Sequence, residues 1–425
     1  MRKMSVTLAI GVLAAGCARG VVPVTPEERD ALQTEAREAI ARGSAEVARL
    51  DDEGWDESSC EALDAHYTSV RLPNQRSASG HDLGPDPREE RVLNARVAYM
   101  RGLVAGRCGD PERARAHYEA ALAIEDDFCA PRVALASQAE AAGNPARARA
   151  LLQAALREDP RCGDAYVAMA RVQRLHFGER EAAVANLRRA LAMEADDVRT
   201  LVELAQVYWD WGREEPERLA LAAVICRQAQ LIDPTYAPLY DTWGLVDIAR
   251  GDLTEASAKF AEARRLDPDL FEAHMNFGQL TLSQRAYADA AEAFRDARRL
   301  KPRSYDATIG LGVALRGLGE TEAAEARYRE AASFDDARPE AYFDLAILYQ
   351  EHMAGSVEDL KHADAMLEAF VERAKAGGQH GEALQSVLRW CGQRRGCRPG
   401  RAQNIHDTLV ALGERAEDAR PGWTH

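Results

Sequence analysis

The chain has 425 residues, with 54 Lys and Arg against 69 Asp and Glu, so its formal net charge at pH 7 is −15. An acidic chain is a poor candidate for nucleic-acid binding, which needs a clustered basic face. No small-molecule substrate is indicated either, because the sequence lacks HExxH, GxSxG, a phosphate-binding GxxxxGK[ST] and a strand-borne GxGxxG. We therefore predict no enzyme and no cofactor.

Residues 1–16 have the features of a signal peptide. Arg2 and Lys3 supply positive charge, and the apolar stretch that follows is too short for a permanent membrane span. Removal of these two cations takes the net charge from −15 to −17. An ordinary secretory signal with an incidental cysteine is one interpretation of this leader.

The small residues before Cys17 resemble a bacterial lipobox, although Ala14 stands where Leu is commoner. This resemblance implies that Cys17 becomes the lipidated first residue of the mature protein, and lipidation of Cys17 is the favoured interpretation of the leader. The sorting rule of the same family, applied to Ala18, implies the outer membrane, with the protein facing the periplasm.

Residues 17–91 are predicted to form an anchor, a helix and a linker. Thr25 followed by Pro26 and two acidic residues is typical of a helix start, and we expect this helix to end near Leu50. Residues 73–87 are rich in Gly, Pro, Ser and Asp, which favours a loop. This loop is either a tether or a docking segment.

Residues 235–336 repeat with a period of thirty-four, which is typical of a repeat architecture. With Ala237, Phe271 and Tyr305 as place 1 of successive rows, five columns recur. They are Gly244, Gly278 and Gly312 at place 8; Ala256, Ala290 and Ala324 at place 20; Phe260, Phe294 and Tyr328 at place 24; Ala263, Ala297 and Ala331 at place 27; and Pro268 and Pro302 at place 32.

Each row is predicted to form two helices joined by a short turn. The small residues at places 8, 20 and 27 let the two helices cross closely beside the aromatic ring at place 24. Gly251 suits the left-handed end of the first helix, and Pro268 cannot continue the second. One row cannot bury its own apolar face, so neighbouring rows must stack.

These columns resemble the tetratricopeptide repeat (TPR). The resemblance implies an all-α fold, a right-handed solenoid of about eight rows over residues 92–376. Insertions are expected at residues 176–178, 209–218 and 352–359, on loops that often carry contacts.

Residues 377–425 are predicted to form capping helices around the Cys391–Cys397 loop. The lipidated plan and the tail GCRPGRAQNIHDTLVALG also resemble the TPR lipoproteins of bacterial gliding-motility machines. The arginines of this tail either meet an acidic partner or anionic headgroups, or form a solvated surface. They are Arg389, Arg394, Arg395, Arg398 and Arg401.

Seven cysteines are left besides Cys17, and an extracytoplasmic location permits disulfides. Cys391 and Cys397 are the favoured pair, and a bridge among Cys60, Cys108 and Cys129 is a second option. Cys226 falls at place 24 of row four and is expected to be a buried free thiol. No metal site is predicted, because the Cys391–Cys397 spacing, even with His380 or His406, is not that of a zinc finger.

Other charged groups are expected to have structural roles. The Arg pairs 264–265 and 298–299 fall at the ends of second helices, where they complement the helix dipole and stay solvated. The acidic pairs 126–127 and 335–336 are expected to cap the helices that follow them.

The TPR resemblance implies that the first helices line a concave face into which place 5 points. Six of the seven residues at this place are apolar, which indicates a groove for an apolar peptide or amphipathic helix, or packing against the next helix. The Lys, Asn and Arg set of chaperone-binding TPR clamps is missing. The candidate groove residues are Val133, Val167, Val202, Met275, Ile309 and Phe343, with Asp241 as the exception.

The expected function is that of a lipid-anchored scaffold that binds other envelope proteins, in a gliding-motility machine by the resemblance of the tail. A type IV pilus or secretin assembly lipoprotein, a periplasmic chaperone and an adaptor for cell-wall enzymes are the alternatives. Repeat architecture does not choose among them, because fold does not imply function.

Overall fold

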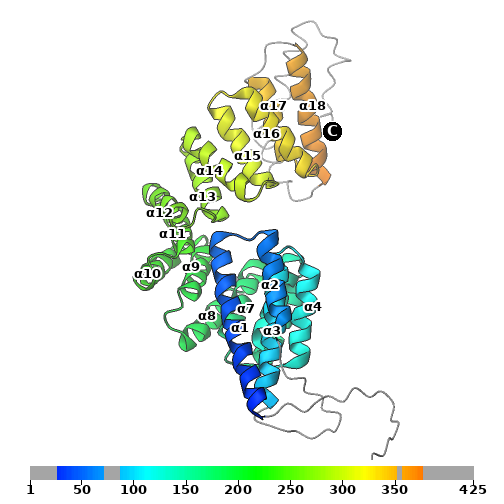
Figure 1. Ribbon diagram of the computed structural model, residues 1–425. Coiled ribbons are helices and arrows are strands. Elements are labelled where there is room, and N and C mark those ends of the chain that lie inside the picture. Colours follow the sequence, from blue (N-terminus) through cyan, green and yellow to red (C-terminus); the bar gives the residue numbers. More distant parts are fainter. Residues whose placement is uncertain (1–25, 71–86, 352–356, 377–425) are drawn as a thin grey trace, which may run out of the picture. The chain divides into compact units, whose positions relative to one another are not determined.

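The structure is a computed structural model that describes residues 26–70, 87–351 and 357–376. Over these residues the chain forms helices and no strand, which confirms the all-α fold class. None of the described helices is long and apolar enough to cross a bilayer. The chain divides into two compact units, residues 1–194 and 195–425 (Figure 1). Cys17, Cys391, Cys397 and the arginine-rich tail lie outside the described residues.

The first unit contains two N-terminal helices followed by three helix pairs. The N-terminal helices α1 (Pro26–Glu53) and α2 (Glu57–Ser69) both pack against the first helix of the first pair. The pairs are α3 (Pro87–Arg107) with α4 (Pro111–Ile124), α5 (Cys129–Ala141) with α6 (Pro145–Glu158), and α7 (Gly163–Val172) with α8 (Arg180–Met193).

Helix α2 was not predicted, because its acidic and serine-rich sequence lacks a clear apolar stripe. Asp56 starts it: its side chain accepts from the backbone N–H of Ser59, whose hydroxyl in turn accepts from the backbone N–H of Asp56. Such a capping box satisfies backbone donors that a helix start leaves open. Leu63 and Tyr67 are the buried side chains of α2, and they pack it into the apolar core of the unit.

The insertion of row three takes the form of a π-helix, η1 (Gln173–Phe177), which continues α7. Gly178 ends it with a φ of 65°, a left-handed conformation that suits glycine. Buried Asn186 of α8 donates to Gln173 at 2.8 Å and ties the inserted turn to the pair. The insertion therefore widens the turn without breaking the pair.

The described residues of the second unit form five helix pairs. They are α9 (Val198–Gly212) with α10 (Arg218–Ile232), α11 (Ala237–Arg250) with α12 (Leu253–Leu266), α13 (Phe271–Ser283) with α14 (Tyr287–Leu300), α15 (Tyr305–Gly317) with α16 (Thr321–Phe334), and α17 (Glu340–Glu351) with α18 (Val357–Ala376). From α10 to α16, each second helix also contacts the first helix of the next pair. Together the described parts of the two units contain the eight predicted pairs.

The helices of a pair cross closely because glycine at place 8 leaves room for the aromatic ring at place 24. A Cβ atom on Gly244 would lie 2.5 Å from Phe260, and one on Gly312 would lie 2.5 Å from Tyr328. Both rings are fully buried. The predicted close crossing is therefore confirmed, and no larger residue fits place 8 without displacing the ring.

Two disulfides join helices in the described part of the first unit. Cys60 of α2 bonds Cys108, directly after α3, and Cys129 at the start of α5 bonds Cys162, directly before α7. The first bridge lies within the predicted set. Cys129 instead pairs with Cys162, a residue not considered for it. Cys226 is a buried free thiol, as predicted.

The prediction that two acidic pairs cap the next helix is wrong. Helix α5 begins after Phe128 without a side-chain cap, so neither Asp126 nor Asp127 caps it. Asp335 accepts from the backbone N–H of Ala337 at 3.1 Å, and Asp336 binds Tyr342 and Arg373. Asp335 therefore shapes the turn between rows, and Asp336 joins α17 to α18.

Two glycines of α3 give a matched test of the close crossing. A Cβ on Gly102 would lie 2.4 Å from the Tyr118 ring, whereas one on Gly106 would meet its nearest neighbour, Ala114, at an ordinary 3.7 Å. We expect Gly102→Ala to lower the free energy of unfolding by about 1–3 kcal/mol through overpacking. Gly106→Ala should raise it by about 0.5–1 kcal/mol, because alanine is the better helix former. Urea denaturation measures both, and equal effects of the two substitutions would contradict the crossing argument.

Candidate interaction surface

The predicted groove residues lie on the first helices of both units but differ in exposure. Val133 on α5 and Val167 on α7 are half-buried in the first unit. Val202 on α9 is only 3% exposed and belongs to the core of the second unit. Met275, Ile309 and Phe343 are half-buried on α13, α15 and α17. The structure therefore brings together three of the candidates on successive first helices of one unit.

These three side chains are partly buried because they pack against the core of the second unit. Met275, Ile309 and Phe343 all border one cluster, which includes the fully buried Phe294 and Tyr328. The Phe343 ring lies 5.2 Å from that of Phe370, on α18. Each residue thus packs against neighbours and keeps an exposed portion, and the groove stays a prediction. We call Met275, Ile309 and Phe343 the apolar face.

Asp241 on α11 is the polar residue of the same column. Its carboxylate is 9% exposed and accepts from Asn276 of α13 at 2.8 Å. Burial raises the pKa of Asp241 to about 6, against the smaller opposing effect of that hydrogen bond. Next to it, Thr242 accepts from Gln206 of α9 at 3.1 Å. At place 5 and the residue after it, polar bonds therefore link α9, α11 and α13, whereas place 5 of α13, α15 and α17 carries apolar side chains.

The raised pKa of Asp241 predicts a pH-dependent stability. The folded chain binds the proton more tightly than the unfolded chain, where the pKa is about 3.9. Protonated Asp241 thus makes its full contribution to the free energy of unfolding below about pH 4. This contribution is lost as the pH rises through about 6. Asp241→Asn should raise the free energy of unfolding by about 2–3 kcal/mol at neutral pH and change little near pH 4.

Urea denaturation at several pH values measures the effect of Asp241→Asn. Asp289→Asn, on an exposed position of α14, is the control and should show no comparable gain. The same gain at both ends of the pH range would show that the carboxylate charge is not the cause.

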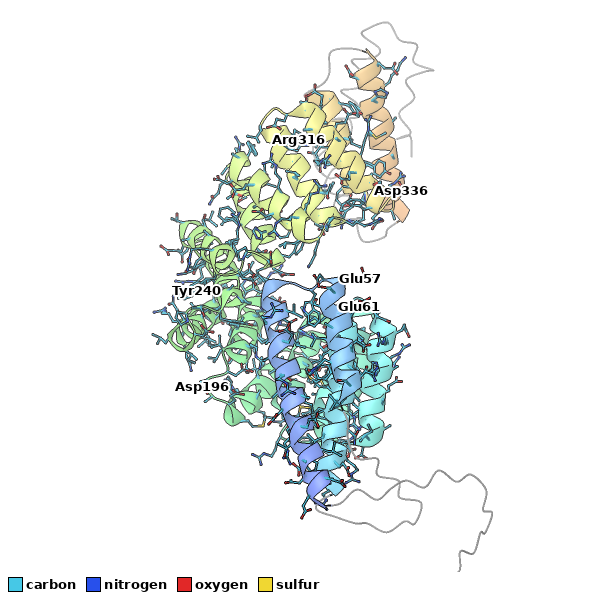
Figure 2. The ribbon with its side chains drawn as sticks, in the orientation of Figure 1. Glu57, Glu61, Asp196, Tyr240, Arg316 and Asp336 are labelled. Carbon is cyan, nitrogen blue, oxygen red and sulfur yellow. A yellow bond between two sulfur atoms is a disulfide. The ribbon has the colours of Figure 1, made fainter. Side chains whose placement is uncertain are left out.

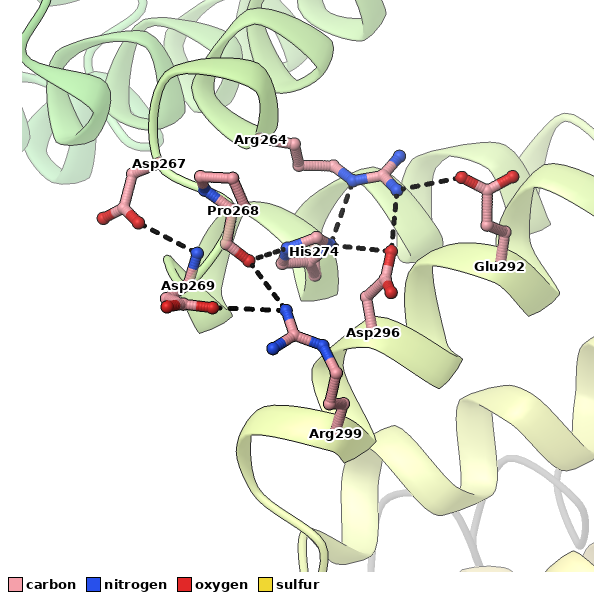
Figure 3. Close-up of polar contacts among 8 residues, drawn as sticks. All are labelled: Arg264, Asp267, Pro268, Asp269, His274, Glu292, Asp296 and Arg299. Carbon is pink, nitrogen blue, oxygen red and sulfur yellow. Dashed lines mark hydrogen bonds and ion pairs between the residues drawn. The ribbon is translucent and has the colours of Figure 1, made fainter. Parts of the chain in front are cut away.

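A network of charged and polar side chains joins α12, α13 and α14 (Figure 3). Arg264 Nε donates to His274 Nδ1 at 3.0 Å, so the proton of this imidazole sits on Nε2, which donates to the carbonyl of Pro268 at 2.8 Å. The Arg264 guanidinium also meets Asp296 at 3.2 Å and Glu292 at 3.4 Å. One arginine therefore connects three helices of two successive rows.

The prediction that both Arg pairs stay solvated is wrong for one member of each pair. The side chain of Arg264 is 15% exposed, and that of Arg298, bound to Glu330 at 2.7 Å, is 19% exposed. Arg265 and Arg299 are the exposed members, with 66% and 58%. The buried members hold neighbouring rows together because an acid of the next row lies within reach.

A third arginine–acid pair lies on the first helices. Arg316 of α15, labelled in Figure 2, donates to Asp344 of α17 at 2.9 Å, and both side chains are largely buried. Burial raises the pKa of Asp344, against the opposing effect of Arg316. This pair fixes α17 beside α15, next to the apolar face.

The first unit contains an acidic cavity of about 440 Å³ among the starts of α3, α5 and α7. Burial, followed by the neighbouring Asp127, raises the pKa of Glu125. Oxygens of Glu125, Asp126 and Asp127 lie within 4.8 Å of one another, but exposed acids often gather without an ion, so we infer no metal site. Lining residues include Val92, Arg96, Phe128, Glu158, Asp159, Asp164 and both cysteines of the Cys129–Cys162 bridge.

Comparison with known proteins supports the repeat assignment. Two family models described as tetratricopeptide repeat match the chain, one over residues 133–176, 242–305 and 276–342 and the other over residues 95–128. The chain thus contains tetratricopeptide repeats. No curated protein matches it.

Several solved structures are similar to this chain. Human IFIT1, solved as a dimer with m7Gppp-AAAA, is 16% identical with a TM-score of 0.52, over 78% of this chain and 76% of IFIT1. A thermophilic TPR protein of Thermus thermophilus is 26% identical with a TM-score of 0.41, over 44% of this chain and 97% of that protein. Pseudomonas aeruginosa pilF is 19% identical with a TM-score of 0.41, over 54% of this chain and 99% of pilF. These likenesses concern the fold.

The repeats and the apolar face together indicate the class of this protein, which is a protein-interaction scaffold. Stacked TPR helix pairs form a scaffold for protein–protein interaction. Some first helices keep apolar atoms exposed on one face. A partner protein that covers this face buries apolar surface area.

Proposed function

We propose that this protein is a lipid-anchored scaffold on the periplasmic side of the outer membrane, where it assembles other proteins of an envelope machine. The apolar face carries this proposal. Met275, Ile309 and Phe343 lie on three successive first helices and remain partly exposed although each borders the core. An extended apolar peptide or an amphipathic helix suits such a surface.

Two features support the extracytoplasmic location. The Cys60–Cys108 and Cys129–Cys162 bridges suit an oxidising compartment, because cytosolic thiols are kept reduced. The leader with Cys17 supports lipidation, and the described chain starts with α1 at Pro26, nine residues later. The lipid on Cys17 would hold the repeats at the membrane surface.

The host machine that we propose is a gliding-motility machine. Support for it comes from the arginine-rich tail together with the plan of a lipidated TPR chain. The chain would act by binding, without catalysis or cofactor, and its partners would be envelope proteins rather than nucleic acid.

The proposed anchor predicts incorporation of a fatty acid at one residue. Cells that express the chain are labelled with a clickable palmitate analogue, and the label should be lost in Cys17→Ala. Cys226→Ala is the control, because this buried thiol should not affect the label. Persistence of the label in Cys17→Ala contradicts the anchor.

The apolar face predicts the loss of partners when it is charged. We expect the chain crosslinked in intact cells to bring down several subunits of one envelope machine, and Met275→Glu with Ile309→Glu to lower this recovery about tenfold or more. Ala258→Glu with Ala288→Glu is the control: it adds equal charge on exposed positions of α12 and α14. The milder pair Met275→Ala with Ile309→Ala serves if the charged pair unfolds.

The identity of the recovered proteins decides the function. Subunits of a gliding machine support the proposal, and unchanged recovery from a folded apolar-face variant contradicts it. Recovery of a wall hydrolase alone indicates a regulator of cell-wall enzymes. Recovery of many unfolded outer-membrane clients indicates a chaperone, and recovery of a secretin indicates a pilus-assembly role.

A further inference from the structure

The second helices of neighbouring rows are joined by an arginine–acid pair that recurs at fixed places. Arg264 at place 28 on α12 meets Asp296 at place 26 on α14 at 3.2 Å. Arg298 at place 28 on α14 meets Glu330 at place 26 on α16 at 2.7 Å. Each pair fills the space between two successive second helices.

The next pair of second helices, α16 and α18, lacks both members of this ion pair. Place 28 on α16 is Ala332. On α18, Ala363 is fully buried like Ala290 and Ala324 at place 20, so place 26 falls at Ala369. Two alanines therefore stand where the preceding rows have an arginine and an acid.

A cavity of about 240 Å³ lies beside the first of these alanines, Ala332. We call it the α16–α18 pocket; its lining residues are Arg329, Ala332, Tyr342, Leu345, Tyr349, His362 and Met366. Tyr342, Leu345 and Tyr349 come from one side of α17 and form an aromatic and aliphatic wall, since they recur at three- and four-residue spacing. This volume suits a single bulky side chain rather than a larger ligand.

The lining contains one cation, Arg329, and the imidazole of His362. Arg329 is 63% exposed and His362 is 52% exposed, and none of the lining residues is acidic. Among the described residues, Arg329 meets Tyr349 and Glu325 through Nη2, so its Nε and Nη1 donors can bind a further carboxylate. His362 lies 3.8 Å from Glu358 on its own helix, a long contact.

We propose that the α16–α18 pocket binds one bulky apolar side chain of a partner segment that carries acidic residues next to it. The apolar side chain fills space beside Ala332, the counterpart of Arg264 and Arg298 in the two preceding rows, and a neighbouring carboxylate meets Arg329. This inference rests on the proposed function as a scaffold, and it adds a second site with its own chemistry. It concerns second helices, whereas the apolar face lies on first helices.

Binding of defined peptides tests the pocket. The full mature chain is titrated by fluorescence anisotropy with a short labelled peptide that has one Phe between Glu residues. We expect saturable binding that weakens about tenfold or more when the Phe is replaced by Ala. Replacement of Glu by Lys should weaken it as well, and so should added salt, which screens exposed charges. Equal binding of all three peptides, or no binding of the first, overturns the proposal.

A pocket-filling variant supplies the structural control. Ala332→Arg with Ala369→Glu rebuilds the ion pair of the preceding rows, so it should keep the fold and abolish peptide binding. Ala258→Arg with Ala288→Glu places the same side chains on exposed positions of α12 and α14 and should leave binding unchanged. Unchanged binding in a folded Ala332→Arg, Ala369→Glu protein overturns the proposal.

A photo-crosslinker at Tyr342 in place of the tyrosine identifies other occupants. Crosslinks to the peptide that compete with unlabelled peptide support the proposal. Crosslinks only within the chain, to residues 377–425, or only to a second copy overturn it. The apolar-face variant Met275→Glu with Ile309→Glu should still bind the peptide, so failure of the pocket and failure of the apolar face give different results.

Discussion

The stacking of the rows from α11 to α16 depends on the contact between a glycine at place 8 and an aromatic ring at place 24. Phe294 shows why, because a Cβ would lie 2.8 Å from this ring at Gly278 of its own pair and 2.5 Å from it at Gly310 of the next pair. The buried ring is therefore held between glycines of two first helices. Burial of such a side chain stabilises the fold by about 1.5–3 kcal/mol. One constraint thus sets both the crossing within a pair and the distance to the next pair.

Polar contacts then fix the direction in which each new row leaves the preceding one. Tyr166, Tyr240 and His274 each donate to the carbonyl of a proline six residues earlier, at 3.3, 2.9 and 2.8 Å (Tyr240 is labelled in Figure 2). Two residues that lie thirty-three apart in the sequence also join the start of one row to the start of the next. The type of contact that they make differs between rows. Cys129 and Cys162 form a disulfide there, whereas Arg338 lies 3.8 Å over the ring of Tyr305. A disulfide in one row and a cation–π contact in another thus join the same two places of the repeat.

The sequence predicts well what repeats and poorly what depends on a neighbour in space. The glycine and aromatic columns predicted the rows over residues 235–336, because each column reports a contact made in successive rows. Several rows outside that block were predicted from smaller residues at the same places, such as Ala136 with Leu152 and Ala170 with Leu187. By contrast, the burial of Arg264 and Arg298 depends on Asp296 and Glu330, each thirty-two residues further along the chain. A basic pair at a helix end looks alike whether or not such an acid is in reach. The partner of Cys129 was missed for the same reason, since connectivity does not follow from spacing alone.

The candidate surfaces contain residues that differ from the others of their column. The repeat itself does not explain such residues, because they take no part in the contacts that recur from row to row. Place 5 alone did not predict exposure: Val202 is buried, whereas Ile309 keeps an exposed portion, since the packing of the neighbouring helices decides it. Asp241 breaks that column with a buried carboxylate, and Ala332 breaks the arginine positions with a pocket. In a chain of repeated rows, stability explains the places that stay constant. Specificity must then come from the places that vary, and these lie on both the first and the second helices.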